Sequence, residues 1–270
     1  MIAAVNVSAA NAAFWNEPCG TALARSIGIT TVTRETLAQF DRAYFAMYPY
    51  LRGYVDALDL PSKRVLEVGV GYGTLGQYVA ERAASYQAVD IAEEPVGLLQ
   101  QRMALIGRPT DGVVQGSALD LPLPDESIDA VISIGCLHHT GDLTRAVDEV
   151  RRVLVPGGTA VVMVYNRYSL RRLINVPRAH VRSRLTGRRA AEMIRLMYDG
   201  NSLGDAAPHT DFVSVGRARQ LFRGFGQLRV DVRNFDEYRF TRPGIALKRA
   251  WFLGWADRIL GLDLYVVAVR

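Results

Sequence analysis

The chain has 270 residues, of which 49% are apolar and 22% charged, so it is long and apolar enough to build a full hydrophobic core. Its net charge of +5 is unevenly placed, because residues 167–189 hold eight arginines and no acid while the remainder is net negative. This distribution excludes a generally basic nucleic-acid binder. Two cysteines are too few for a disulfide framework and lack metal-ligand spacing.

Hydropathy predicts neither a membrane span nor a secretory signal at the first residues, so a cytoplasmic location is expected. Residues 1–32 are expected to be irregular, and Thr33 is expected to cap a helix over residues 34–58. Strand and helix patterns then alternate. The predicted strands cover residues 64–70, 86–91, 112–118, 127–135 and 158–166, and the predicted helices cover residues 74–83, 93–105 and 142–154. Apolar strands that alternate with helices predict a doubly wound α/β fold, with a parallel sheet covered on both faces.

An arginine-rich helical insertion is expected after the fifth strand, with Pro177 interrupting it. The arginines are interpreted as a solvated helix face, with phosphate binding as the alternative. The inward, apolar side of that helix is expected to comprise Leu170, Leu173, Ile174 and Val181. The later elements are predicted to be helices over 190–198, 215–225 and 245–260, and strands over 228–236 and 264–270. The expected organisation is a cap over 1–60, a core over 61–166, the insertion and a loop over 167–214, and the rest of the sheet over 215–270.

A glycine cluster follows the first strand in the stretch VLEVGVGYGTLG, residues 65–76. Glycine at such a turn lets a ligand approach the main chain, and the helix start that follows favours an acceptor or an anion. The dinucleotide fingerprint fits poorly, because Thr74 stands where its third glycine belongs. Glu67 also precedes the turn, and a carboxylate there repels a pyrophosphate. A nicotinamide oxidoreductase is therefore a weaker alternative than a protein that binds a cationic ligand.

The segment EVGVGYGT resembles the first motif, (E/D)xGxGxG, of class I S-adenosylmethionine-dependent methyltransferases. Later stretches agree with that family in order and spacing. They are AVDI, GSALDLPLPDESIDAVIS, LHHTGDLTRAVDEVRRVLVPGGTAVV and LYVVAVR. The resemblance, to a type 11-like methyltransferase domain, covers residues 60–166 well and the C-terminal region loosely. It implies a Rossmann-like, mostly parallel seven-stranded sheet with helices on both faces, and S-adenosylmethionine as cofactor.

The resemblance also implies which residues bind that cofactor. Glu67 is assigned to the methionyl end and Asp90 to the ribose hydroxyls. Ser117 stands where many relatives have an acid facing the adenine amino group. The other positions carried over from the motifs are Gly69, Gly71, Gly73, Ile91, Ala118, Ile134 and Gly135. No metal site is expected.

Three histidines are candidates for a general base, because the pKa of histidine lies near neutrality. His138 and His139 follow the fourth strand, where the carboxyl rim of the sheet binds ligands, and His209 lies on a loop expected to cover the acceptor pocket. His209 is also a candidate substrate contact. The candidate lid aromatics are Trp15, Tyr44 and Tyr48. Packing around the core is the alternative role for each of these side chains.

The predicted function is methyl transfer to a small-molecule acceptor in a biosynthetic reaction, with a hydroxyl oxygen of a natural product, sugar or lipid favoured. Transfer to nitrogen or carbon is equally compatible with the cofactor site. RNA or protein methylation is a further alternative, although the chain reads IGCLHH where an NPPY-type motif for base amines would stand. A non-catalytic binding protein is another alternative. For the assembly, a homodimer is one alternative.

Overall fold

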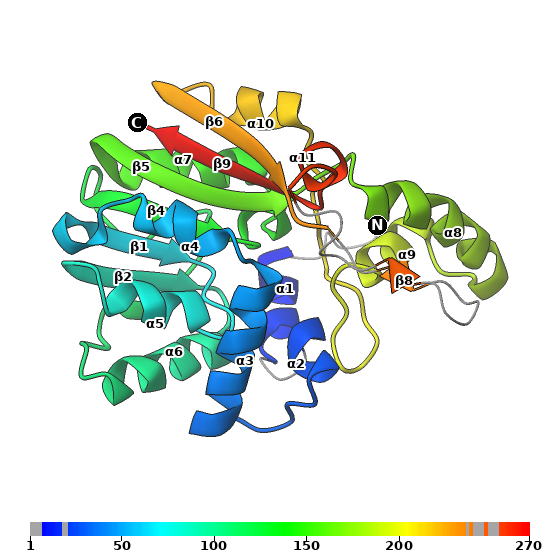
Figure 1. The fold of residues 1–270 in the computed structure, drawn as a ribbon, viewed down its shortest axis with the longest axis horizontal. Helices are drawn as coiled ribbons and strands as arrows, with labels where there is room; N and C mark the ends of the chain where they lie inside the picture. Colours follow the sequence, from blue (N-terminus) through cyan, green and yellow to red (C-terminus); the bar gives the residue numbers. More distant parts are fainter. Residues whose placement is uncertain (1–6, 18–20, 236–237, 240–245, 248–253) are drawn as a thin grey trace.

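A single mixed sheet forms the centre of the protein (Figure 1). The computed structural model describes residues 7–17, 21–235, 238–239, 246–247 and 254–270. Within these residues the sheet has seven strands in the order β3-β2-β1-β4-β5-β9-β6. The strands are β1 (Arg64–Val68), β2 (Ser85–Asp90), β3 (Val113–Gln115), β4 (Ile128–Ile134), β5 (Leu154–Tyr165), β6 (Gln227–Arg233) and β9 (Asp263–Val269). The α/β class and the covered sheet are confirmed, but the sheet is mixed, because β9 runs antiparallel to both β5 and β6.

Helices cover both faces of this sheet because successive side chains of each strand point to opposite sides. Val65 packs on one face with α4 (Leu51–Asp56) and α5 (Thr74–Ala80), and α6 (Glu93–Leu105) continues this layer. Leu66 packs on the other face with α7 (Leu143–Val153) and α10 (Val215–Leu221). Glu67 follows the same alternation, so its carboxyl enters the α5 side of the sheet as the only acid of β1.

The N-terminal segment is more ordered than the composition indicated. The prediction of an irregular segment over residues 1–32 is wrong, because α1 (Val7–Trp15) and α2 (Ala22–Ser26) form there. Thr33 does cap a helix, α3 (Arg34–Met47), through a reciprocal pair of hydrogen bonds with Thr36. The helix expected to reach residue 58 ends at Met47, since the residue before Pro49 avoids helical dihedrals, and α4 follows as a separate helix.

The buried side chain of Arg102 binds α3 to the core through an ion pair with Asp41. The guanidinium of Arg102, with 1% of its side chain exposed, binds both oxygens of the Asp41 carboxylate at 2.9 and 3.1 Å. The Thr74 hydroxyl donates to the same carboxylate at 2.6 Å. The departure from the dinucleotide pattern at Thr74 therefore has a structural reason, because this hydroxyl joins the start of α5 to α3.

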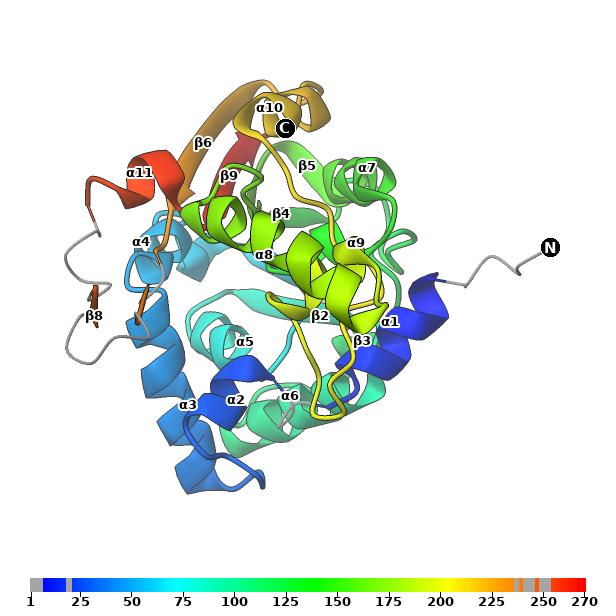
Figure 2. The ribbon, with the colours of Figure 1, turned by 90° about the vertical axis from the view of Figure 1, so that its right-hand side faces the viewer.

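Two helices follow β5 beyond the carboxyl ends of the parallel strands, as Figures 1 and 2 show. They are α8 (Leu170–Thr186) and α9 (Ala190–Leu196). Pro177 lies inside α8, so the expected interruption is wrong; proline removes one backbone hydrogen bond there, and the helix continues. The expected inward packing of Leu173 and Val181 is also wrong, because these side chains are 54% and 60% exposed.

The C-terminal region differs from its prediction at one helix. Of the helix expected over 245–260, the structure contains α11 (Asp257–Leu260), while Ala246–Leu247 form β8, which pairs with β7 (Tyr238–Arg239). Residues 248–253 of that prediction lie outside the described residues. β9 then returns into the sheet between β5 and β6, which places Asp263 at the rim where β5 ends.

Candidate functional site

The turn between β1 and α5 has the conformation that glycine permits. Gly69, Gly71 and Gly73 have φ angles of +84°, +51° and +73°, a region that side chains with a Cβ rarely adopt. A Cβ on Gly69 would overlap the side chain of Cys136, whereas one on Gly71 would project into open space. Gly71 therefore leaves room that a ligand can occupy.

The fourth glycine of the cluster has a different role. A Cβ on Gly76 would lie 2.5 Å from the Tyr86 hydroxyl and 2.8 Å from the Glu67 carboxylate. The hydroxyl of Tyr86 donates a hydrogen bond to Glu67. Gly76 is thus explained by the packing of α5 over this pair and not by approach of a ligand.

Glu67 is buried, with 3% of its surface exposed, and it lines a cavity on the α5 side of the sheet. Burial raises the pKa of its carboxyl to about 8, and the charge of Asp90 acts in the same direction, while the hydrogen bond from Tyr86 opposes the shift. The group is therefore neutral in the free protein near pH 7, and a cation bound beside it would favour its ionised form.

Asp90, at the end of β2, holds the glycine turn in place. Its Oδ2 accepts from the Val70 amide at 2.7 Å and its Oδ1 accepts from the Ala92 amide at 2.9 Å. Burial raises the pKa of the Asp90 carboxyl, although its backbone hydrogen bonds act against this shift. The amides of Gly71 and Ile91 act on the same carboxyl, so four backbone amides surround Asp90, and a ligand hydroxyl would share its oxygens with them.

A small cavity of about 180 Å³ lies along the carboxyl ends of β1, β2 and β4. Its lining unites the majority of the residues expected to bind the cofactor, which are Gly69, Gly71, Asp90, Ile91, Ser117, Ala118, Ile134 and Gly135. Of the two remaining positions, Glu67 lines the neighbouring cavity, and Gly73 lines neither of the two because it caps α5. The Ser117 hydroxyl accepts from the Leu119 amide at 3.1 Å. The geometry fits a nucleoside ligand that contacts the glycine turn.

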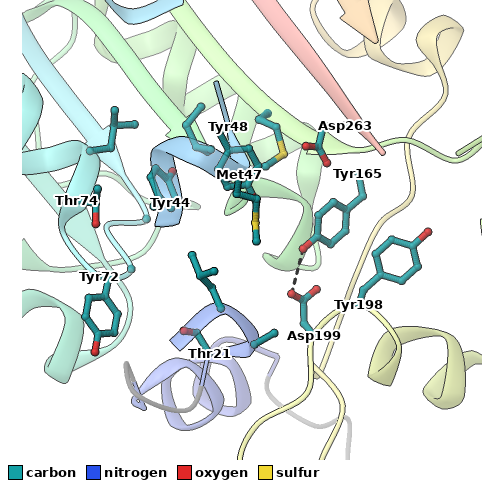
Figure 3. A pocket seen from close by; sticks show the side chains of 18 of the residues that line it. Thr21, Tyr44, Met47, Tyr48, Tyr72, Thr74, Tyr165, Tyr198, Asp199 and Asp263 are labelled. Carbon is teal, nitrogen blue, oxygen red and sulfur yellow. Dashed lines mark hydrogen bonds between the residues drawn. The ribbon is translucent and has the colours of Figure 1, made fainter. Parts of the chain in front are cut away.

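A larger cavity of about 820 Å³ adjoins the small one (Figure 3). The two share Gly69, Gly71, Ile134 and Gly135, together with Trp15 and Thr21. Most of its other lining side chains are aromatic or aliphatic, among them Phe14, Phe40, Tyr44, Met47, Tyr48 and Met163. A ligand held in the small cavity can therefore present a group across the glycine turn into a largely apolar space.

Asp199, in the loop after α9, is one of four acids among the described residues that line this space, with Glu17, Glu67 and Asp263. Asp199 accepts a hydrogen bond from the Tyr165 hydroxyl at 3.0 Å, as the dashed line in Figure 3 marks. Its other oxygen lies 3.7 Å from Nε2 of His139. Burial raises the pKa of Asp199, and burial lowers that of His139 even though the Asp199 charge opposes that shift. The pair therefore holds an acid and a base whose pKa values are moved toward each other.

His139 has a defined tautomer because of its second ring nitrogen. Nδ1 lies 2.7 Å from the main-chain oxygen of His209, which can only accept, so Nδ1 carries the proton and Nε2 is left as a base. The ring of Trp15 lies 4.9 Å from the His139 ring, and Asn11 donates to the His139 carbonyl at 2.6 Å. Trp15 and Asn11, which both belong to α1, thus hold His139 in position.

The other predicted catalytic residues are placed differently. The His138 side chain is fully buried and lines neither cavity. The imidazole of His209 also lines neither cavity; it lies 3.3 Å from Asp211, and its main chain is what contacts His139. The predicted lid aromatics Trp15, Tyr44 and Tyr48 do line the large cavity.

Sequence reasoning missed Asp199 and Tyr165. Tyr165 ends the fifth strand, and the rim rule that selected His138 and His139 would have selected it too. Asp199 lies in a polar loop, and no local pattern distinguishes it from the acids around it. Among the described residues, no group of three His, Cys, Asp or Glu side chains is placed to hold a metal ion.

Residues of the N-terminal segment, within 7–17 and 21–33, contact the loop after α9 beside the large cavity. The Arg25 guanidinium of α2 donates to the Gly200 carbonyl at 3.0 Å, and the Ser202 amide donates to Glu17 at 3.3 Å. Asn16 accepts from the Glu94 amide of α6 at 2.7 Å. The segment therefore bridges the core and the loop after α9.

Residues 66–162 match the family model described as a methyltransferase domain. They form a methyltransferase domain of the class I, S-adenosylmethionine-dependent type.

Two curated relatives of this domain come from mycobacteria. A fatty-acid O-methyltransferase of Mycolicibacterium smegmatis is 38% identical over 102 residues, which are 37% of this chain and 36% of the relative. A probable phthiotriol/phenolphthiotriol dimycocerosates methyltransferase 2 of Mycobacterium ulcerans is 41% identical over 37% of this chain and 38% of its own length. The matched stretch thus spans less than two fifths of these relatives.

Solved structures extend the likeness of the fold beyond the methyltransferase domain. A methyltransferase described as a possible histamine N-methyltransferase, from Thermotoga maritima, covers 86% of this chain and 98% of its own, with a TM-score of 0.51 and 20% identity. A putative methyltransferase in complex with the Haloferax volcanii Trm112 activator covers 88% and 99%, with a TM-score of 0.53 and 18% identity. At these identities the comparisons establish the fold, and S-adenosylmethionine is the cofactor of this type of domain.

Proposed function

We propose that the protein transfers a methyl group from S-adenosylmethionine to an oxygen atom of an apolar, lipid-like small molecule. The observation that carries this proposal is the junction of the two cavities, which share Gly69, Gly71, Ile134 and Gly135. A nucleoside cofactor bound in the small cavity would reach this junction, and an acceptor in the large cavity would approach it from the other side. Such an arrangement favours in-line displacement, because it holds both reactants in position.

The cofactor supplies an activated methyl group on a sulfonium ion. Asp90, which holds the glycine turn through backbone amides, would accept from the ribose hydroxyls. Glu67 would face the methionyl end, where a positive charge would lower its raised pKa and favour the carboxylate. Gly71 lets the ligand reach the main chain. The hydrogen bond from Arg25 to Gly200 holds the N-terminal segment beside the large cavity, where it would reduce solvation of the reactants.

The lining of the large cavity indicates an apolar acceptor. Aromatic and aliphatic side chains dominate it, and its volume of about 820 Å³ accommodates a chain or ring system much larger than the cofactor's methyl group. The names of the two mycobacterial relatives, one of which acts on fatty acids, agree with a lipid acceptor. Trp15, Tyr44 and Tyr48 are proposed to contact it.

A hydroxyl acceptor needs a base, and Asp199 with His139 is proposed for this role in place of an isolated histidine. As the acceptor oxygen forms its bond to the methyl group and the bond from that methyl to sulfur breaks, Asp199 Oδ2 takes the hydroxyl proton. The lone pair on His139 Nε2, 3.7 Å away, faces the protonated carboxyl. Tyr165 orients the carboxylate through Oδ1. The carbonyl of His209 keeps the proton on Nδ1. A carboxylate acceptor needs no base, so the two acceptor types are distinguishable by their dependence on Asp199.

The first test is calorimetric titration with S-adenosylhomocysteine, with NADH as a parallel ligand. Binding of S-adenosylhomocysteine alone supports the proposal, and binding of NADH alone refutes it in favour of an oxidoreductase. Labelled S-adenosylmethionine is then offered with long-chain fatty acids, fatty alcohols and water-soluble hydroxyl or amine compounds. Label found on the apolar oxygen acceptors supports the acceptor class, and label found on amines alone refutes it.

A further inference from the structure

Helix α8 carries an apolar stripe that faces solvent. Leu173, Val181 and Leu185 are 54%, 60% and 80% exposed, and Pro177 between them is exposed too. These residues are spaced by four, so each is turned by only about 40° from the one before, and together they form one continuous face. The opposite face packs on α9 through the fully buried Ala179. The stripe is therefore the outer surface of a helix whose inner surface is already covered.

Arginines surround this stripe. Arg178, Arg182 and Arg184 of α8, and Arg189 at the start of α9, are exposed, and none forms an ion pair within the part of the chain that the structure describes. Arg188 lies 3.7 Å from Glu192, the first acid after a run without Asp or Glu that begins at Val150. Since the rest of the chain is net negative, the positive field is concentrated on this helix.

We infer that α8 docks on the surface of an anionic lipid bilayer. An interfacial helix is amphipathic in this way, with apolar side chains that enter the region of the lipid headgroups and basic side chains that meet the phosphates. Arginine is suited to phosphate because its planar guanidinium donates two parallel hydrogen bonds. Leu185, the most exposed member of the stripe, lies at the end of α8 beside Arg184, where it can enter the bilayer first.

The combination of charge and apolar surface favours a bilayer over the other occupants. A nucleic acid would engage the arginines but leave the leucines in water, and α8 itself carries no Phe, Tyr or Trp for base stacking. A second copy of this helix would bring the arginines of both copies together, because the segment carries no compensating acid. An anionic bilayer satisfies both features at once.

The docking face also lies close to the acceptor cavity. Arg171, in the first turn of α8, lines the large cavity, and Figure 2 shows α8 crossing in front of the sheet's carboxyl end. A bilayer bound to α8 would therefore lie near the cavity, so that a lipid acceptor need not cross water. This consequence rests on the proposed function, whereas the docking itself does not.

The test is co-sedimentation of the full chain with vesicles, of phosphatidylcholine alone or with about 30% phosphatidylglycerol, at about 50 and 500 mM salt. We expect at least about tenfold stronger binding to the anionic vesicles at low salt, and loss of most of this difference at high salt. Equal binding to both vesicle types, or none to the anionic vesicles at low salt, would overturn the inference.

Two variants test the apolar stripe and the arginines separately, and each variant has a matched control. Leu173→Ser/Val181→Ser/Leu185→Ser removes the stripe, and its control replaces equally exposed side chains elsewhere, Leu105→Ser/Leu203→Ser/Ile259→Ser. The charge variant is Arg178→Gln/Arg182→Gln/Arg184→Gln/Arg189→Gln, and its control is Arg34→Gln/Arg42→Gln/Arg219→Gln/Arg223→Gln. Each α8 variant is expected to weaken vesicle binding at least about fivefold and each control less than about twofold.

Further measurements exclude the other occupants. If the protein is a dimer that the stripe variant converts to a monomer, or if it binds RNA through the four arginines but no vesicles, the inference is wrong. Titration with S-adenosylhomocysteine should give the same affinity for both α8 variants as for the native chain. A protein that binds vesicles but not S-adenosylhomocysteine would refute the proposed function and leave the docking surface intact.

Discussion

The imidazole of His139 and the carboxylate of Asp199 face each other at 3.7 Å, although 60 residues of chain and the fifth strand separate them. Both side chains are largely buried, and Asp199 adjoins the large cavity. Such a pair, with pKa values shifted by burial, is typical of acid–base sites. The pair titrates as a unit, so its pH dependence belongs to both residues.

If this pair is the base, Asp199→Asn should lower kcat for a hydroxyl acceptor by about 10² to 10⁴ while leaving the affinity for S-adenosylhomocysteine unchanged. In the native protein, activity should rise with pH, and its acid limb should lie above the range of an ordinary carboxyl because burial raises the pKa of Asp199. His209→Ala is the matched control, because it removes the imidazole but keeps the carbonyl that holds His139. A loss of activity in His209→Ala as large as that in Asp199→Asn would contradict the assignment.

Asp90 should be required for the cofactor in two ways. Asp90→Ala should weaken binding of S-adenosylhomocysteine at least about tenfold, because it removes a ribose acceptor and releases the Val70 amide of the glycine turn. Asp90→Asn keeps one oxygen acceptor and should lie between the alanine variant and the native protein. Calorimetry measures all three, and near-native affinity of the alanine variant would remove Asp90 from the site.

Glu67 should make the stability of the free protein depend on pH. Its folded pKa of about 8 lies above the value of an unfolded glutamate, about 4.3, so the folded state holds a proton that the unfolded state releases between these values. Stability should therefore fall as pH rises from about 4.5 to 8 and level off above the folded pKa. Glu67→Gln, which is neutral throughout, should lack this contribution. Urea denaturation at pH 5, 6.5 and 8 measures the difference, and parallel pH curves for both proteins would show that the shift is absent.

The attachment of α3 to the core should depend on the buried Arg102. Asp41→Asn should lower the free energy of unfolding by about 3 kcal/mol, since breaking a buried ion pair leaves an uncompensated charge. That value is at the low end of the range because the Asp41 side chain is 29% exposed. Arg82→Gln, which disrupts a surface pair with Glu81, should cost only about 0–1 kcal/mol. Chemical denaturation compares them, and equal losses would show that burial of Arg102 contributes nothing.

The amino-acid sequence by itself determined the core of this protein. Apolar strands alternating with helices, and a glycine turn that places Gly69, Gly71 and Gly73 at positive φ, are local properties that the chain carries in its order of residues. Asp90 and Ser117 were assigned by resemblance to the methyltransferase motifs, and both line the small cavity. The carboxyl ends of parallel strands meet at one edge, so strand order alone placed these residues together.

Tertiary structure decided the rest, because packing between distant segments has no local signal. The sheet is mixed because β9 inserts between β5 and β6 in reverse direction, a choice that neither strand's composition records. Thr74 and Gly76 differ from a ligand-binding pattern because they contact Asp41 and Tyr86, which belong to other elements. Asp199 became a candidate base only when the fold brought its loop to Tyr165 and His139. On α8, the arginine count was readable from the sequence, but which of its leucines face water depended on the helix side that α9 covers.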